Sequence, residues 1–202
     1  MVYTFQRVRL DNTGVLEVRS GTLSLPYPSG GTNRGTFNAG AGATILVSDY
    51  TFGDGSQLSG LGTHRWALGT VRLNGAIAAE HVEWAGAMLM GTNTISGVVH
   101  WLSGVIHSSA AVTIATNGTL NLEGGVNKDL NGVLTNAGTV TWTGAGWLRL
   151  DGGRIYNLPG ALFDVQNDQA FAKEGGNPVL DNRGTLRKSA SGGVHIPTRA
   201  LG

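Results

Sequence analysis

A short glycine-centred motif recurs nine times along this chain of 202 residues, at intervals of 20 to 24 residues. Clear examples are TNGTLNL, NAGTVTW and NRGTLRK. The central glycines are Gly14, Gly35, Gly55, Gly75, Gly97, Gly118, Gly138, Gly160 and Gly184. A fixed period of this size is typical of a chain built from stacked supersecondary units rather than from one closed globule.

The position two residues after each glycine is apolar in eight of the nine repeats. The residues there are Leu16, Phe37, Gln57, Ile77, Val99, Leu120, Val140, Leu162 and Leu186. Successive side chains of a strand point to opposite faces, so this position predicts one buried row shared by all the repeats. The glycine predicts a sharp turn, because glycine adopts positive φ without steric cost.

About 20 residues per repeat fit two or three short strands with corners between them. Further strands are expected between the glycines, for example over 43–49 and 111–116. Glycine interrupts every window long enough for a helix. We therefore predict an all-β parallel β-solenoid, a single-stranded β-helix of about nine coils, with residues 1–202 as one domain. A β-sandwich or a propeller is the structural alternative.

The composition excludes several classes of function. Charged residues make up 13% of the chain, the net charge is +1 and there is no cysteine. This balance argues against non-specific nucleic-acid binding, and it excludes disulfides and thiolate metal sites. No apolar run approaches the length of a transmembrane helix, so no membrane insertion is expected. The basic residues near the end predict a solvated face: Arg183, Arg187, Lys188 and Arg199.

The two ends of the chain lack the features that usually close a solenoid. The start does not show the pattern of a signal peptide, and no capping helix is evident in the final residues. Open solenoid ends expose strand edges and usually need caps. We expect the chain to be a segment of a longer repeat protein, with flanking solenoid repeats of the same protein as its neighbours.

The strings TNGTLNL, LTNAGTVTW and LDNRGTLRKS resemble repeats of large bacterial surface and secreted proteins. Similar repeats occur in autotransporter passengers and in filamentous-haemagglutinin-like adhesins. The resemblance is one of repeat style and is best over roughly 110–190, so it carries over no functional residues. It implies export, a β-helical stalk, and a role in adhesion or surface structure.

The stretch from 64 to 107 is unusually rich in histidine and tryptophan and holds the candidate ligand-binding residues. Glu80, His81, Glu83 and His100 could approach one another on adjacent coils, as a divalent metal site would require. A solvated polar face is the favoured reading, so no metal and no cofactor are predicted.

Trp66, Trp84 and Trp101 lie in the same stretch. Trp101 and Trp142 fall in one column two coils apart, with Leu122 between them. Interior packing is favoured for this row. Exposed indoles would instead stack on sugar rings or on a protein partner.

The best carboxylate pair for a glycoside hydrolase is Asp129 with Asp151, from adjacent coils. A surface ion pair is expected between Asp164 and Lys188, which share a column. No nucleophile, phosphate-binding or zinc-protease motif is present. No catalytic residue is therefore predicted.

These observations favour a non-catalytic structural or adhesive segment of a secreted or cell-surface bacterial protein. Surface glycans, or proteins of a host or neighbouring cell, are the expected partners. One alternative is a carbohydrate-binding or polysaccharide-degrading β-helix. Another is a phage tail-fibre piece, which would form a stable trimer.

Overall fold

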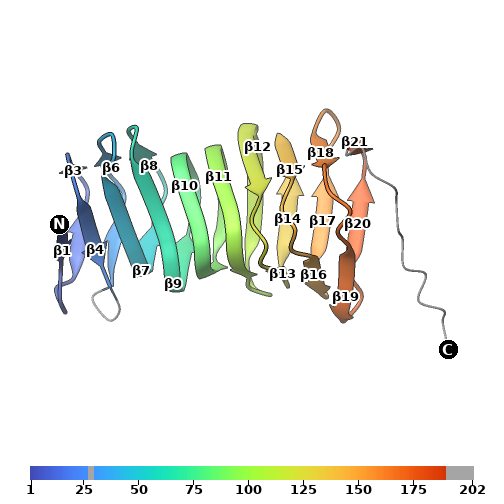
Figure 1. The fold of residues 1–202 in the computed structure, drawn as a ribbon, viewed down its shortest axis with the longest axis horizontal. Helices are drawn as coiled ribbons and strands as arrows, with labels where there is room; N and C mark the ends of the chain where they lie inside the picture. Colours follow the sequence, from blue (N-terminus) through green and yellow to red (C-terminus); the bar gives the residue numbers. More distant parts are fainter. Residues whose placement is uncertain (27–29, 190–202) are drawn as a thin grey trace.

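The computed structural model describes residues 1–26 and 30–189, which wind into one rod of stacked strands (Figure 1). The strand pairs run parallel throughout the described residues, and none of those residues forms a helix. The chain makes about nine turns, so the prediction of an all-β parallel β-solenoid is confirmed.

Each coil contributes a strand to three parallel ladders. The first ladder begins with β1 (Val2–Thr4) and β4 (Thr22–Leu25), and it passes through β7 (Thr44–Phe52), β9 (Thr63–Leu73), β10 (Gly75–Met90), β11 (Thr92–Ile106), β12 (Ala111–Leu122), β15 (Thr139–Trp142), β18 (Leu162–Val165) and β21 (Thr185–Lys188). In the middle of the rod β7, β9, β10, β11 and β12 are long enough to turn a corner and serve two or three ladders.

The other two ladders use the remaining strands together with parts of those long ones. The second ladder contains β2 (Leu10–Asn12), β5 (Gly31–Asn33), β13 (Lys128–Leu130), β16 (Leu148–Asp151) and β19 (Phe171–Gly175). The third contains β3 (Val15–Val18), β6 (Thr36–Ala39), β8 (Ser56–Ser59), β14 (Val133–Asn136), β17 (Arg154–Asn157) and β20 (Val179–Asn182).

Inward side chains of successive coils form continuous rows in the core. In the first ladder one row runs through Ile45, His64, Val82 and Val99, each in register with the next. All four side chains are buried. Alternation along each strand puts the intervening side chains on the outer surface.

The row two residues after each glycine does not form one interior line, which corrects the sequence-based expectation. Leu16 pairs with Phe37 in the third ladder, whereas Val99, Leu120 and Val140 pair in the first. The glycine motif therefore marks one corner of the coil in the N-terminal half and a different corner in the C-terminal half. The same turn residues suit either corner, so sequence alone does not distinguish them.

Two repeats also depart by one residue from the expected buried position. Gln57 is exposed and the adjacent Leu58 packs inward opposite Phe37. Phe163 likewise replaces Leu162 in the buried row opposite Val140. Ile77 is buried as predicted, but it pairs with Ser56 and so lies in a different inner row from Leu58.

Two different constraints favour glycine at positions of the repeat. Gly97 has a φ of 87°, as the predicted turn needs. Gly35 and Gly138 do not have positive φ; a Cβ at either would overlap a backbone carbonyl oxygen of the preceding coil. At these corners glycine permits the close approach of successive coils.

Asparagine side chains connect the coils at both of these corners. The Nδ2 of Asn12 donates to Oδ1 of Asn33 at 2.7 Å. In the C-terminal half, Asn136 donates to Asn157 at 2.8 Å and Asn157 to Asn182 at 2.7 Å. Asn33, Asn136 and Asn157 are buried, so these bonds satisfy amides that would otherwise be unpaired in the core.

Apolar side chains are exposed at both ends of the described rod. Tyr3, in register with the buried Leu23, is 69% exposed, and Leu186 at the opposite end is 43% exposed. A hollow of about 720 Å³ opens at the N-terminal end between β1 and β3, with Phe5 and Leu16 in its lining. These residues occupy positions that are buried in the interior coils.

Candidate functional site

The predicted tryptophan ligands lie in the core. Trp66, Trp84 and Trp101 stand in register on three successive coils of the first ladder, and each is at most 1% exposed. The same row continues through Leu122 to Trp142, which confirms the predicted column. Interior packing is thus the role of these indoles, and they offer no outer surface to a sugar.

The tryptophan row is tightly packed. Trp84 and Trp101 stack with ring centroids 4.2 Å apart and planes 5° from parallel. The Nε1–H of Trp84 donates to the carbonyl of Ala87 at 2.6 Å. The indole nitrogens of Trp66 and Trp101 have no hydrogen-bond partner among the described residues.

The polar candidates Glu83 and His100 lie outside the core, as a row on the outer face of the first ladder. Arg65, Glu83 and His100 are in register on consecutive coils. Arg65 forms an ion pair with Glu83, and His100 Nδ1 lies 3.1 Å from a carboxylate oxygen of Glu123. The carboxylates are therefore engaged by neighbouring side chains.

His81 does not join this row. It lies at an irregularity of β10 between Ala79 and Val82, where its φ is 51°. Across residues 1–26 and 30–189 no group of three or more histidine, cysteine, aspartate or glutamate side chains is placed to hold a metal.

The carboxylates proposed for hydrolysis are not arranged as an acid–base pair. Asp129 accepts two hydrogen bonds from Arg149, at 2.6 and 2.8 Å. Asp151 is in register with Gly175 and not with Asp129. The guanidinium thus occupies both oxygens of Asp129.

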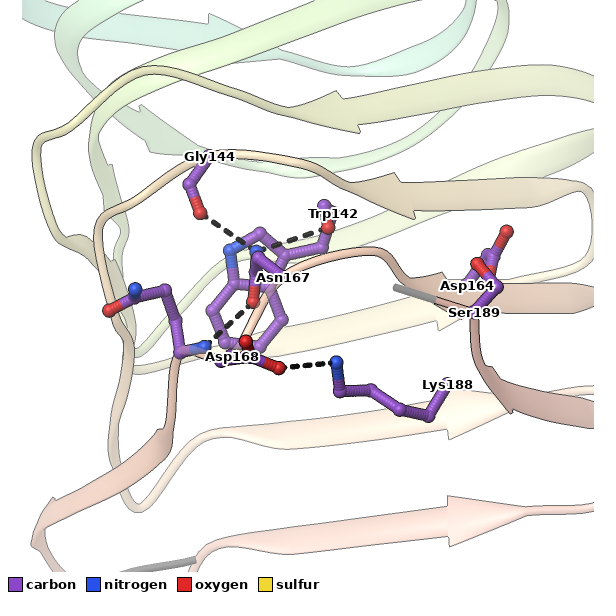
Figure 2. Close-up of polar contacts among 8 residues, drawn as sticks. Trp142, Gly144, Asp164, Asn167, Asp168, Lys188 and Ser189 are labelled. Atoms are coloured by element: carbon purple, nitrogen blue, oxygen red, sulfur yellow. Dashed lines mark hydrogen bonds and ion pairs between the residues drawn. The ribbon is translucent and has the colours of Figure 1, made fainter. Parts of the chain in front are cut away.

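The predicted ion pair between Asp164 and Lys188 is wrong by one register position. Arg187 is the residue opposite Asp164, and its Nη2 donates to that carboxylate at 2.6 Å. Ser189 and Gln166 donate to it as well. Lys188 instead pairs with Asp168 at 2.8 Å, as Figure 2 shows.

The Asp164 carboxylate is almost inaccessible, with a side chain only 2% exposed. The hydrogen bond from Arg187, supported by those from Gln166 and Ser189, holds the pKa of Asp164 well below its usual range. The group is a fixed anion that joins two coils.

The basic residues near the end are paired with acidic neighbours. Arg183 binds Asp181, Arg187 binds Asp164 and Lys188 binds Asp168. Arg199 lies outside the described residues. The three described cations are therefore not an unpaired basic patch.

A stack of loops between the first and second ladders forms a feature that sequence reasoning missed. Here residues 123–127, 143–147 and 166–170 connect strands on three successive coils. Asn167 fixes loop 166–170. Its Nδ2 donates to the carbonyls of Trp142 and Gly144, and its Oδ1 accepts from the backbone N–H of Gln169 (Figure 2). We call these three segments the corner-loop stack.

A buried lysine orders the first of these loops, residues 123–127. Lys128 is fully buried, and its Nζ donates to the carbonyls of Glu123 and Val126 at 2.5 and 2.8 Å. Burial lowers the pKa of Lys128 to about 8. The lysine thus ties together the two ends of a glycine-rich loop.

Trp147 is the exposed aromatic residue of the corner-loop stack. It is 46% exposed, whereas Trp66, Trp84, Trp101 and Trp142 are fully buried. Its backbone N–H donates to Oδ1 of Asn127 on the preceding coil at 2.9 Å. Alternation with the apolar Leu148 and Leu150 was the sequence signal that placed Trp147 outward.

No family model, curated protein or solved structure matches this chain. None of the described residues forms a helix of the length and hydropathy that crossing a bilayer would require.

Proposed function

We propose that this chain is a non-catalytic structural and adhesive rod segment of an exported bacterial surface protein. The observation that carries the proposal is the unbroken stacking of coils in three parallel ladders, with inner apolar residues exposed at both ends. Such a rod gains stability from each coil-to-coil contact and can be lengthened by further coils. Its end faces suit flanking solenoid repeats of the same protein.

The resemblance of the repeats to bacterial surface proteins supports the location and the adhesive role. Outer faces decorated with paired charges, such as Arg65 with Glu83, suit a solvent-exposed stalk. Glycans and proteins of a neighbouring cell remain the proposed partners. A trimeric phage fibre is the alternative, and a mass measurement in solution would reveal a trimer.

Removal of one complete coil tests the structural role. Deleting residues 44–62 joins Ala43 to Thr63, the residue in register with Thr44. We expect a shorter rod that keeps parallel ladders and a cooperative unfolding transition. Deleting residues 44–53 is the matched control: it removes half a coil, places the coils after the junction out of register with those before it, and should lower the stability and the cooperativity of unfolding.

The adhesive role is tested with beads that carry the full chain or the 44–62 deletion variant. Both should attach to bacterial or host cell surfaces. The deleted coil contains none of the corner-loop stack, which is where Trp147 is exposed. Absence of attachment by the full chain would refute the adhesive role. Loss of folding in the whole-coil deletion would refute the additive rod.

A further inference from the structure

The corner-loop stack differs from the same corner in the middle of the rod. There β9, β10 and β11 pass from the first ladder to the second within one continuous strand. In the following coils the strands stop and loops 123–127, 143–147 and 166–170 project instead. Loops held on a rigid scaffold are the usual location of binding residues.

A buried ammonium group, that of Lys128, holds loop 123–127 in place. In the second ladder Lys128 is in register with Leu148, which in turn is in register with Phe171, so the row is otherwise apolar. Burying a cation there is unfavourable unless its hydrogen bonds are satisfied, and an apolar residue would suit the row. The hydrogen bonds to Glu123 and Val126 fix a loop whose glycines would otherwise leave it mobile.

This ordered loop supports an outward aromatic surface. Trp147 is half exposed, and Val126, in the loop of the preceding coil, is 59% exposed. The two loops that carry them are otherwise rich in small residues, including Gly125 and Ala145. An exposed indole presents the kind of amphipathic surface on which the apolar face of a sugar ring packs.

Polar groups flank the indole without adding net charge. Arg149 follows Trp147 by two residues and so lies on the same outer face, where it pairs with Asp129. Their side chains remain 36% and 28% exposed. A neutralised pair of this kind offers hydrogen bonds to hydroxyl groups, and it does not favour a strongly charged ligand.

We propose that Trp147, with Asn127, Asp129 and Arg149, forms a binding platform for a neutral oligosaccharide. A sugar ring stacks on the indole, and its hydroxyl groups bond to the Asp129–Arg149 pair. Lys128 is a positioning residue that holds the loop beneath the platform. This inference rests on the adhesive role proposed above and names its ligand class.

Trp147 supplies its own reporter, because the other four tryptophans are buried. Acrylamide quenching of tryptophan fluorescence in the full chain would be measured with cellohexaose, chitohexaose or maltohexaose, and with an oligogalacturonate as the anionic probe. At least one neutral saccharide should protect Trp147 from the quencher. The anionic probe should not.

Matched variants assign the effect to the platform. Trp147→Ala should weaken the binding of that saccharide by about tenfold or more, and Trp147→Phe should retain much of it. Lys128→Met should weaken it less while the circular dichroism stays that of a β-protein. Leu68→Ala, which removes another exposed apolar side chain, should leave the affinity unchanged.

Protection by the anionic probe alone would overturn the proposal, as would saccharide binding that survives in Trp147→Ala. No protection by any neutral saccharide would also overturn it, even where the beads described above attach to cells. In that case the adhesive role stands and a protein partner is indicated.

Discussion

The rings of Trp84 and Trp101 stack face to face on adjacent coils, with centroids 4.2 Å apart. The two residues are in register in β10 and β11, so the coil spacing itself brings the indoles into contact. The row from Trp66 to Trp142 is therefore a continuous part of the core. The predictions below concern this row and the buried polar groups that accompany it.

Replacing Trp101 by alanine should lower the free energy of unfolding by about 3–5 kcal/mol, because it leaves a cavity against Trp84 and Leu122. Trp101→Leu should lose less, because leucine already occupies this row on the next coil. Trp147→Ala is the matched control on the surface and should change stability by about 0.5 kcal/mol or less. Urea denaturation measures all three. Equal losses in Trp101→Ala and Trp147→Ala would contradict the assignment of the row to the core.

The stability of the rod should fall in mild acid because of His64. Burial lowers the pKa of this histidine, which bonds through Nε2 to the carbonyl of Ser59, while Nδ1 has no partner among the described residues. Glu80 and His81 are the charged groups that act on it. In the unfolded chain this histidine is protonated near pH 6.5, whereas in the folded chain it is protonated only at lower pH. The free energy of unfolding therefore decreases as pH falls below about 6.5.

His64→Val tests this assignment, because Ile45 and Val82 flank the position in the same row. Denaturation midpoints at about pH 7.5 and about pH 5.5 should differ less in the variant than in the parent chain. An unchanged difference would show that another group produces the acid sensitivity.

Lys128 should make the stability of the rod depend on pH in the alkaline range. Its pKa in the folded chain is about 8, against 10.5 for an ordinary lysine. Between these values the unfolded chain holds the proton more tightly, so stability should rise as pH increases from about 8 to about 10.5. Lys128→Met should flatten that rise in denaturation experiments. A slope that persists in Lys128→Met would argue against the buried ammonium.

Asp164→Asn should destabilise the rod at neutral pH by on the order of 1–3 kcal/mol, through loss of charge-assisted hydrogen bonds from Arg187 and its neighbours. The native carboxylate has a lowered pKa, so its contribution is present above about pH 3.8 and is lost as pH falls toward the folded value. The difference between parent and variant should therefore shrink in acid. Asp168→Asn, which removes an exposed pair with Lys188, is the control and should have a smaller effect. Equal effects would show that burial of Asp164 is unimportant.

Sequence period and alternation predicted much of the fold. The recurring glycine predicted stacked coils, and a common offset from that glycine predicted that Trp101, Leu122 and Trp142 share a row. The period did not predict the partner of Asp164. Counting from the glycines places Lys188 opposite Asp164, whereas the strand register places Arg187 there, one residue earlier. The period also did not reveal that the glycine motif changes corners, since Asn-x-Gly turns are compatible with both.

The period of this chain, its glycines and its alternating apolar residues by themselves favoured a parallel solenoid, because coils of equal length stack their apolar positions into shared buried rows. Only the tertiary structure decided which rows face inward at each coil and that Lys128 lies inside. The reason is physical: coils of unequal length shift the register by single residues, and each such shift moves a side chain from one face of its strand to the other.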